Sequence, residues 1–214
     1  MFSFQLLKNH AGLHLIGSHM ALKELYRVVH HVNEYSPIIR DKEGFFLALA
    51  YDARKAYEGQ RTVLKPSADY PEAGITYGVE ILWPVLLLQA RMFRQSLAYM
   101  PSTARFQAMA YSLEAVIEEG IRADFPNQSG ELLSAYERID SSHPWAEEKI
   151  NGRGAYYCLL TKSQRNERLL NLLASLDPLY PSMYELRFAN GERGLLSPME
   201  LDCLDDAEWA DPKW

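Results

Sequence analysis

The chain has 214 residues, of which 48% are hydrophobic and 23% are charged; this is ordinary globular composition and excludes a disordered or fibrous protein. The net charge of −6 is concentrated in residues 199–214, which carry six acidic side chains and one lysine, so the rest of the chain is nearly neutral. We therefore expect no nucleic-acid partner, because proteins that bind nucleic acids present a basic stripe.

The N-terminal part of the sequence predicts strands and two helices. Residues 2–6 alternate apolar and polar side chains, and a glycine-containing turn joins them to a second apolar stretch at 13–16, which is the pattern of a β-hairpin. Apolar side chains at helical spacing predict helices over 19–34 and about 42–58. Two further segments have the pattern of strands: 62–65 and 75–82.

The remaining sequence predicts mainly helices. Residues 84–100 are apolar on two sides, so we expect this helix to be sandwiched inside the domain. Further helices are expected at about 102–122, 131–140 and 163–176. A short turn opened by His143-Pro144-Trp145 is expected to stop at Asn151-Gly152. Residues 184–188 alternate and precede Asn190-Gly191, a dipeptide typical of hairpins, which predicts a C-terminal strand.

These elements predict an α+β fold, with a small and mostly antiparallel sheet packed against five or six helices. The sheet is expected to contain the N-terminal hairpin together with central and C-terminal strands. We divide the chain into a single globular domain at 1–198 and an acidic C-terminal tail at 199–214. The state of residues 154–161 stays open, because their periodicity fits a strand or a helix.

The sequence indicates no cofactor or metal site. Cys158 and Cys203 are the only cysteines and lack metal-ligand spacing, and no histidine has a ligand partner at the spacing of a zinc site. We interpret the histidines as surface or capping residues: His10, His14, His19, His30 and His31. The longest apolar run is about half of what spans a bilayer, and no basic leader begins the chain. We therefore expect a cytoplasmic protein without a membrane partner.

The densest segment, "FFLALAYDARKAYEGQR", runs from residue 45 to residue 61. On a helical wheel Asp52 and Arg54 point to opposite sides, so they do not form one site, and Asp52 is expected to pair with Lys55 in solvent. Arg54 lies at the edge of the apolar face and needs solvent or a carboxylate, because a lone buried guanidinium is costly. Glu80 is a candidate partner. The alternative is that Arg54 anchors a substrate.

Several segments in the first 100 residues resemble a family of uncharacterised bacterial proteins of unknown function. The resemblance rests on "LLKNHAGLHLIGS", "ALKELYRVVHHV", "YDARKAYEGQR" and "YGVEILWP", in this order. It implies a bacterial cytoplasmic origin and a single domain. It brings no ligand and no active-site residue with it.

Two functions stay open at the level of sequence. The leading hypothesis is a non-enzymatic interaction or regulatory protein, such as an inhibitor or an immunity-type protein, whose partner is a second copy or another protein. Its candidate binding residues lie in the tail: Asp205, Asp206, Trp209 and Trp214. The alternative is a small enzyme with a polar cleft around Arg54, Tyr57 and Glu80.

Overall fold

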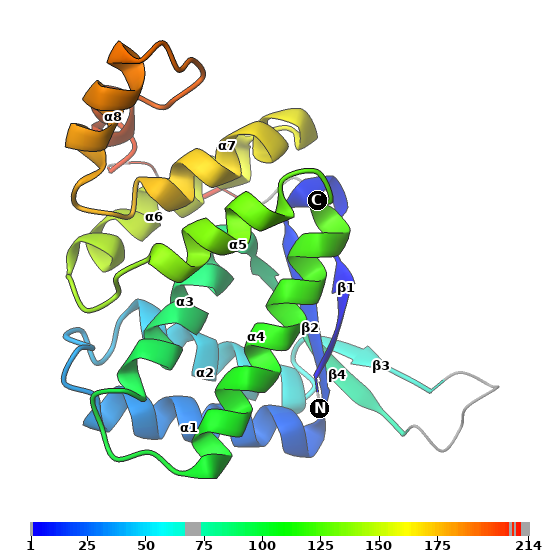
Figure 1. Ribbon diagram of the computed structural model, residues 1–214. Helices are drawn as coiled ribbons and strands as arrows, with labels where there is room; N and C mark the ends of the chain where they lie inside the picture. Colours follow the sequence, from blue (N-terminus) through cyan, green and yellow to red (C-terminus); the bar gives the residue numbers. More distant parts are fainter. Residues whose placement is uncertain (1, 67–73, 206, 208, 211–214) are drawn as a thin grey trace.

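The computed structural model of the protein describes residues 2–66, 74–205, 207, 209 and 210. Four strands in this part of the chain form one antiparallel sheet in the order β1-β2-β4-β3. Their bounds are β1 (Ser3–Leu6), β2 (Gly12–Ser18), β3 (Thr62–Leu64) and β4 (Thr76–Leu82). The predicted N-terminal hairpin and both central strands are confirmed (Figure 1).

Nine α-helices lie in the same described residues, which confirms the α+β class but exceeds the five or six helices expected. Their bounds are α1 (His19–Tyr35), α2 (Phe45–Tyr57), α3 (Trp83–Ser96), α4 (Ala104–Asp124), α5 (Ser129–Arg138), α6 (Trp145–Leu159), α7 (Lys162–Ala174), α8 (Tyr180–Ala189) and α9 (Pro198–Asp202). None of them is long and apolar enough to cross a bilayer.

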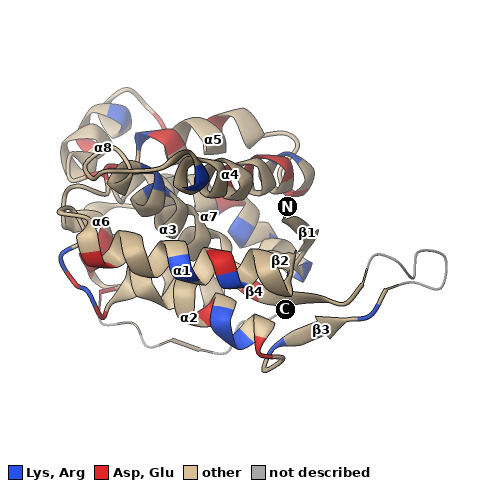
Figure 2. Cartoon of the chain, turned by 90° about the horizontal axis from the view of Figure 1, so that it is seen from below, with Lys and Arg blue, Asp and Glu red and all other residues tan. Residues whose placement is uncertain are grey.

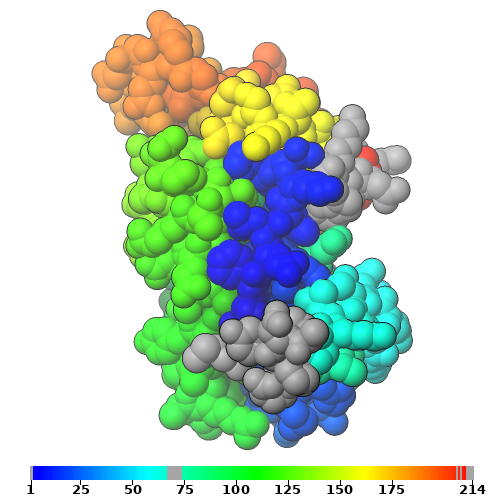
Figure 3. Space-filling model, turned by 90° about the vertical axis from the view of Figure 1, so that its right-hand side faces the viewer, coloured from blue at the N-terminus to red at the C-terminus, as the bar shows by residue number. Residues whose placement is uncertain are grey.

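Strand β2 organises the sheet because it pairs with β1 on one side and β4 on the other. Leu15 lies opposite Phe4 on β1 and opposite Val79 on β4, and it is fully buried. A short 3-10 helix, η1 (Lys8–His10), makes the turn between β1 and β2. Figure 3 shows the N-terminal strands in blue, with α4 in green on one side, the cyan region that includes β3 on the other, and α7 in yellow above them.

Helix α3 is the centre of the helical layer. It contacts the sheet and helices α1, α2, α4, α5, α6 and α7. Most of its side chains are buried, and Trp83, Leu86 and Phe93 have no exposed surface. The two apolar sides read from the sequence therefore both face protein, and the expected sandwiched position is confirmed.

Helix α6 corrects the expected stop at Asn151-Gly152. The helix continues through both residues to Leu159, so most of the undecided segment 154–161 is helical. Gly152 and Gly154 are buried, and neither has a left-handed backbone. They mark places where another segment approaches the helix closely, rather than its end.

Helix α8 shows that the predicted C-terminal strand is wrong. Residues 184–188 lie inside a helix that begins beside Pro181 and stops at Asn190, before Gly191 with its φ of +88°. Tyr180 and Tyr184 are spaced by four residues, as are Tyr184 and Phe188, and the Tyr184 and Phe188 rings stack at 5.7 Å. The alternating segment is too short to distinguish the two-residue period of a strand from the 3.6-residue period of a helix, and the chain forms a helix here.

Candidate functional site

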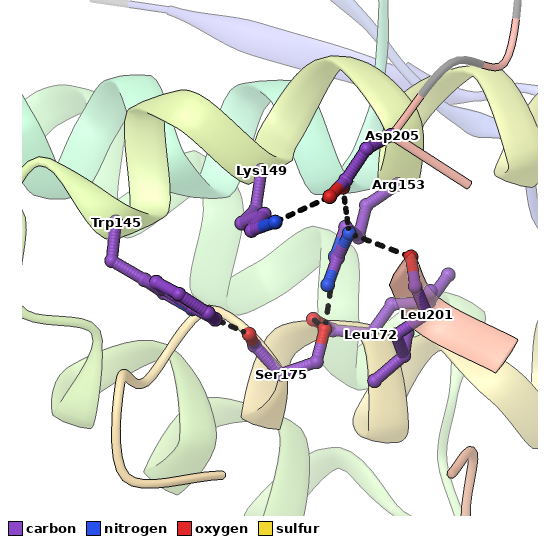
Figure 4. Close-up of polar contacts among 7 residues, drawn as sticks. All are labelled: Trp145, Lys149, Arg153, Leu172, Ser175, Leu201 and Asp205. Atoms are coloured by element: carbon purple, nitrogen blue, oxygen red, sulfur yellow. Dashed lines mark hydrogen bonds and ion pairs between the residues drawn. The ribbon is translucent and has the colours of Figure 1, made fainter. Parts of the chain in front are cut away.

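The described part of the acidic tail lies against helix α6. We call residues Lys149, Gly152, Arg153 and Gly154 of α6 the tail seat, and the described residues of 198–210 the tail segment. The segment starts with α9, whose Leu201 is buried, and Ser197 caps that helix by accepting a hydrogen bond from the Glu200 backbone N–H. The seat and the tail segment together form the candidate functional site (Figure 4).

Arg153 is the centre of the seat and is only 2% exposed. Its Nη1 donates to Asp205 Oδ1 at 2.7 Å and to the Leu201 carbonyl at 3.1 Å, both in the tail segment. Its Nε donates to Ser175 Oγ at 3.4 Å. Burial lowers the pKa of Arg153, whereas the ion pair with Asp205 opposes this shift. The guanidinium therefore depends on the tail for its counter-charge.

Lys149 contacts the same carboxylate from the other side. Its Nζ pairs with Asp205 Oδ2 and lies 4.9 Å from the centre of the Trp145 ring. The Trp145 indole N–H donates to the Ser175 carbonyl at 3.1 Å, which fixes this ring in place. Figure 4 shows the Asp205 carboxylate between the two cationic groups. The Asp205 side chain is nevertheless 32% exposed, so solvent reaches the ion pair from one side.

The two glycines of the seat make room for the tail. A Cβ atom on Gly152 would lie 2.3 Å from the Leu204 carbonyl oxygen, and one on Gly154 would lie 2.2 Å from the Trp209 ring. No side chain fits at either position while the tail is seated. The seat thus combines a cationic centre with two gaps: the backbone of Leu204 fills the gap at Gly152, and the indole ring of Trp209 fills the gap at Gly154. It is suited to binding an acidic segment that carries an aromatic side chain.

The predicted tail residues divide into two groups. Asp205 and Trp209 both lie against the seat, and Trp209 keeps 48% of its surface exposed. Asp206 and Trp214 lie outside the described residues. The sequence analysis missed the seat itself, since it expected the segment that contains it to stop at Asn151-Gly152. The signal that was available is Gly-Arg-Gly inside a segment with helical periodicity.

Arg54 does not form the expected ion pair with Glu80. Its guanidinium lies 5.2 Å from the centre of the Tyr51 ring, and its Nε is buried without a hydrogen-bond partner among the described residues. Burial lowers the pKa of His30, and the charge of Arg54 lowers it further. Arg54 thus faces aromatic groups of α1 and α2 instead of a carboxylate.

The structure brings Arg54 close to Tyr57 but places Glu80 elsewhere. Burial raises the pKa of Tyr57, and the charge of Arg54 opposes this rise. Glu80 is exposed on β4 and lines a hollow together with Asp52 and Arg61, and neither Arg54 nor Tyr57 is among the residues that line it. Asp52 pairs with Arg61 at 3.2 Å rather than with Lys55, because the turn after α2 brings Arg61 back towards the helix.

Besides the half-buried His30, two more histidines depart from the expected surface or capping role. His14 is 6% exposed, and its ring fills the space above Gly78. His10 pairs through Nδ1 with Asp124 at 2.7 Å, and Asp124 also accepts a hydrogen bond from the Trp83 indole at 2.8 Å. This buried pair fixes the turn at η1 to the end of α4. Over the described residues, no group of His, Cys, Asp and Glu side chains is placed to hold a metal ion.

Comparison with known proteins gives one match. A family model described as "Domain of unknown function (DUF6904)" matches residues 2–188, a range that contains the tail seat and ends before the tail segment. No curated protein and no solved structure matches the chain.

Proposed function

The chain belongs to the DUF6904 family, and from this premise we propose that it is a non-enzymatic protein-interaction module of a regulatory kind, as inhibitors and immunity-type proteins are. Its recognition site is the tail seat on α6. The seat binds an acidic, aromatic segment of a protein partner, and the protein's own tail occupies the seat when that partner is absent.

One observation carries this proposal. Arg153 is buried to 98% of its surface, yet the carboxylate that neutralises it comes from a segment beyond the matched domain and stays one third exposed. A buried guanidinium without a counter-charge is strongly disfavoured, so the seat always requires a carboxylate. Because the present carboxylate is partly open to solvent, a competing one can approach and replace it.

The charge distribution supports an electrostatic selection of the partner. Basic and acidic residues both occur along the ribbons of α1 and α2, without a long run of one sign (Figure 2). Lys149 and Arg153 therefore supply a local positive centre on a chain whose net charge is −6. Such a centre selects an acidic segment by its position and not by the overall field of the protein.

We also propose a bacterial cytoplasmic setting. Both cysteines are free, and Cys203 is exposed in the tail segment. A reducing compartment keeps an exposed thiol in this state, whereas an oxidising one favours its pairing with other thiols.

A peptide titration tests the proposed function. A fluorescent peptide of residues 198–214 is added in reducing buffer to the full chain and to its Asp205→Asn variant. In the variant the seat has lost its own carboxylate, so the peptide is expected to bind at least about tenfold more tightly than to the unmodified chain. Anisotropy reports the binding.

Two controls separate seat binding from general charge effects. Glu185→Gln removes one negative charge from an exposed position on α8, and this variant is expected to bind the peptide as weakly as the unmodified chain. A peptide carrying Asp205→Asn is expected not to bind the Asp205→Asn chain. Equal affinity of the native peptide for the unmodified chain and the Asp205→Asn chain, or binding to neither, contradicts the proposal.

A further inference from the structure

A hollow of about 720 Å³ lies between helices α3, α4 and α5, away from the tail seat, with which it shares no residue. Its size falls within the usual range for small-molecule sites. Charged and aromatic side chains line it, with apolar groups between them. The residues that carry the argument are Arg91, Arg94, Glu114, Tyr136 and Glu137.

Two of the three arginines that line the hollow are neutralised by glutamates within it. Arg94 Nε donates to Glu114 Oε1 at 2.8 Å, and its guanidinium stacks 3.9 Å from the centre of the Tyr111 ring. Arg122 pairs with Glu118 at 2.7 Å, since residues four positions apart lie on the same face of a helix. The Arg94 pair is partly buried and the Arg122 pair is exposed, and in both the arginine is already neutralised by a glutamate.

One arginine and one glutamate of the lining remain. Arg91 donates from Nε to the Ile139 carbonyl at 3.2 Å, while its terminal nitrogens have no hydrogen-bond partner in the described part of the chain. The Asp140 carboxylate accepts hydrogen bonds from Ser142, and the charge of Arg91 also helps to lower the pKa of Asp140, without a direct hydrogen bond between the two side chains. Glu137 is exposed and has no ion-pair partner among the described residues. The lining therefore offers one arginine and one glutamate that form no direct ion pair among the described residues.

Tyr136 adds a hydrogen-bonding group without a partner. The residue is 6% exposed, and its hydroxyl is buried with no hydrogen-bond partner in the described part of the chain. The Arg91 guanidinium lies 6.0 Å from the centre of its ring. Burial raises the pKa of Tyr136 well above its usual value, so the hydroxyl is a neutral donor. A buried hydroxyl without an acceptor destabilises a fold, which calls for a reason to keep it.

We propose that this hollow binds a small zwitterion of the amino-acid class with an apolar side chain. The carboxylate lies on Arg91, where the Tyr136 hydroxyl gains an acceptor, and the ammonium lies on Glu137. The apolar side chain packs against Ile117 and Leu133, which also line the hollow. A pure anion meets Glu137 unpaired and a pure cation meets Arg91 unpaired, so only the zwitterion satisfies both.

Three matched compounds test the charge requirement by calorimetric titration of the full chain. L-leucine carries both charges, 4-methylpentanoate carries only the carboxylate, and 3-methylbutylamine carries only the ammonium. L-leucine is expected to bind at least about tenfold more tightly than either of the other two. Equal binding of all three, or no binding of L-leucine at about 10 mM, overturns the proposal.

Variants of the full chain test the assigned residues. Arg91→Gln and Glu137→Gln are each expected to weaken L-leucine binding at least about tenfold. Glu131→Gln, on the same helix but facing a neighbouring hollow, is expected to leave the affinity unchanged. A loss of affinity in the Glu131 variant equal to that in the Glu137 variant overturns the assignment.

Tyr136→Phe distinguishes a ligand-binding role from a structural one. Without ligand, the variant is expected to unfold at a higher temperature, because an unpaired hydroxyl is removed, and to bind L-leucine more weakly. Tyr180→Phe is the control, since the Tyr180 hydroxyl donates to the Leu196 carbonyl at 2.8 Å, and that variant is expected to unfold at a lower temperature. A Tyr136 variant that keeps full affinity, or that melts earlier than the unmodified chain, contradicts the role of this hydroxyl.

Discussion

Asp205 places its Oδ1 atom 2.7 Å from Nη1 of Arg153, a residue 52 positions earlier in the chain. Arg153 is almost completely buried, and Asp205 is partly exposed. The pair therefore links a fixed cationic group in the helical layer to a carboxylate that solvent reaches. The proposed function rests on this asymmetry, because it makes the carboxylate, and not the guanidinium, the member of the pair that a competitor can approach.

Gly152→Ala tests whether the tail needs the gap on α6. In an exposed helix, alanine stabilises relative to glycine by up to about 1 kcal/mol. Here the new Cβ meets the Leu204 carbonyl oxygen at 2.3 Å, so we expect the tail to be displaced and the free energy of unfolding to fall by about 1–2 kcal/mol. Urea denaturation measures the free energy, and limited proteolysis measures the release of the tail.

Gly130→Ala on α5 is the matched control for this prediction. A Cβ at Gly130 has no neighbour within 4 Å, so the substitution is expected to leave the tail protected and the stability equal or slightly higher. If the Gly152 variant gains stability as the Gly130 variant does, the tail does not occupy this gap.

Asp124→Ala tests the buried pair that fixes the N-terminal turn. The Asp124 side chain is 7% exposed, and its removal leaves His10 and the Trp83 indole without their acceptor. We expect a loss of about 3 kcal/mol in the free energy of unfolding, measured with urea. Glu118→Ala removes an exposed pair from the same helix and is expected to cost less than about 0.5 kcal/mol. Similar losses in both variants contradict the structural role of Asp124.

His30 lies on α1 and faces α2, and its burial there predicts that the stability of the protein depends on pH. Burial and the charge of Arg54 lower the pKa of His30 in the folded state, so the unfolded chain binds this proton more readily. The contribution of neutral His30 is complete above the unfolded pKa of about 6.5 and is lost as the pH falls below it. The Tyr26 and Tyr51 rings also face His30.

His30→Gln removes that titration. The variant is expected to lose less free energy of unfolding than the unmodified chain when the pH is lowered from about 7.5 to about 5.5. Urea denaturation at both pH values makes the comparison. His19→Gln, at an exposed position, is the control and is expected to keep the acid sensitivity of the unmodified chain. Identical pH dependence in the His30 variant and the unmodified chain contradicts the account.

The elements with a long, regular pattern were predictable from the sequence. Strand β2, helix α1 and the central helix α3 bury the apolar side chains that their patterns selected, whereas in β1 Phe4 is half-buried and Leu6 is exposed. The strand predicted at residues 184–188 is wrong, because five residues are too few to distinguish the period of two of a strand from the period of 3.6 of a helix. The turn signal after them, Asn190-Gly191, ends a helix here instead of joining two strands.

Only one half of the candidate site, the tail, was predictable from the sequence, and the seat on α6 was not. The tail stood out by its charge and its tryptophans, and Asp205 and Trp209 do contact the domain. The Gly-Arg-Gly sequence around Arg153 does not indicate its counter-charge, because Asp205, which neutralises it, is 52 residues away in the sequence. For Arg54, too, the sequence does not indicate which group its guanidinium contacts. Its answer, an aromatic ring instead of a carboxylate, also depends on how two helices pack.

Hydrogen exchange at residues 198–205 tests the central claim most directly, namely that the tail is held on α6 through Asp205 and is released as a unit. In the unmodified chain we expect slow exchange of the Leu201, Cys203 and Leu204 amides, which donate within α9 and the following turn. In the Asp205→Asn variant these amides should exchange at least about tenfold faster, while α3 and α4 keep their protection. Equal exchange in the two proteins, or a loss of protection throughout the chain, contradicts the claim.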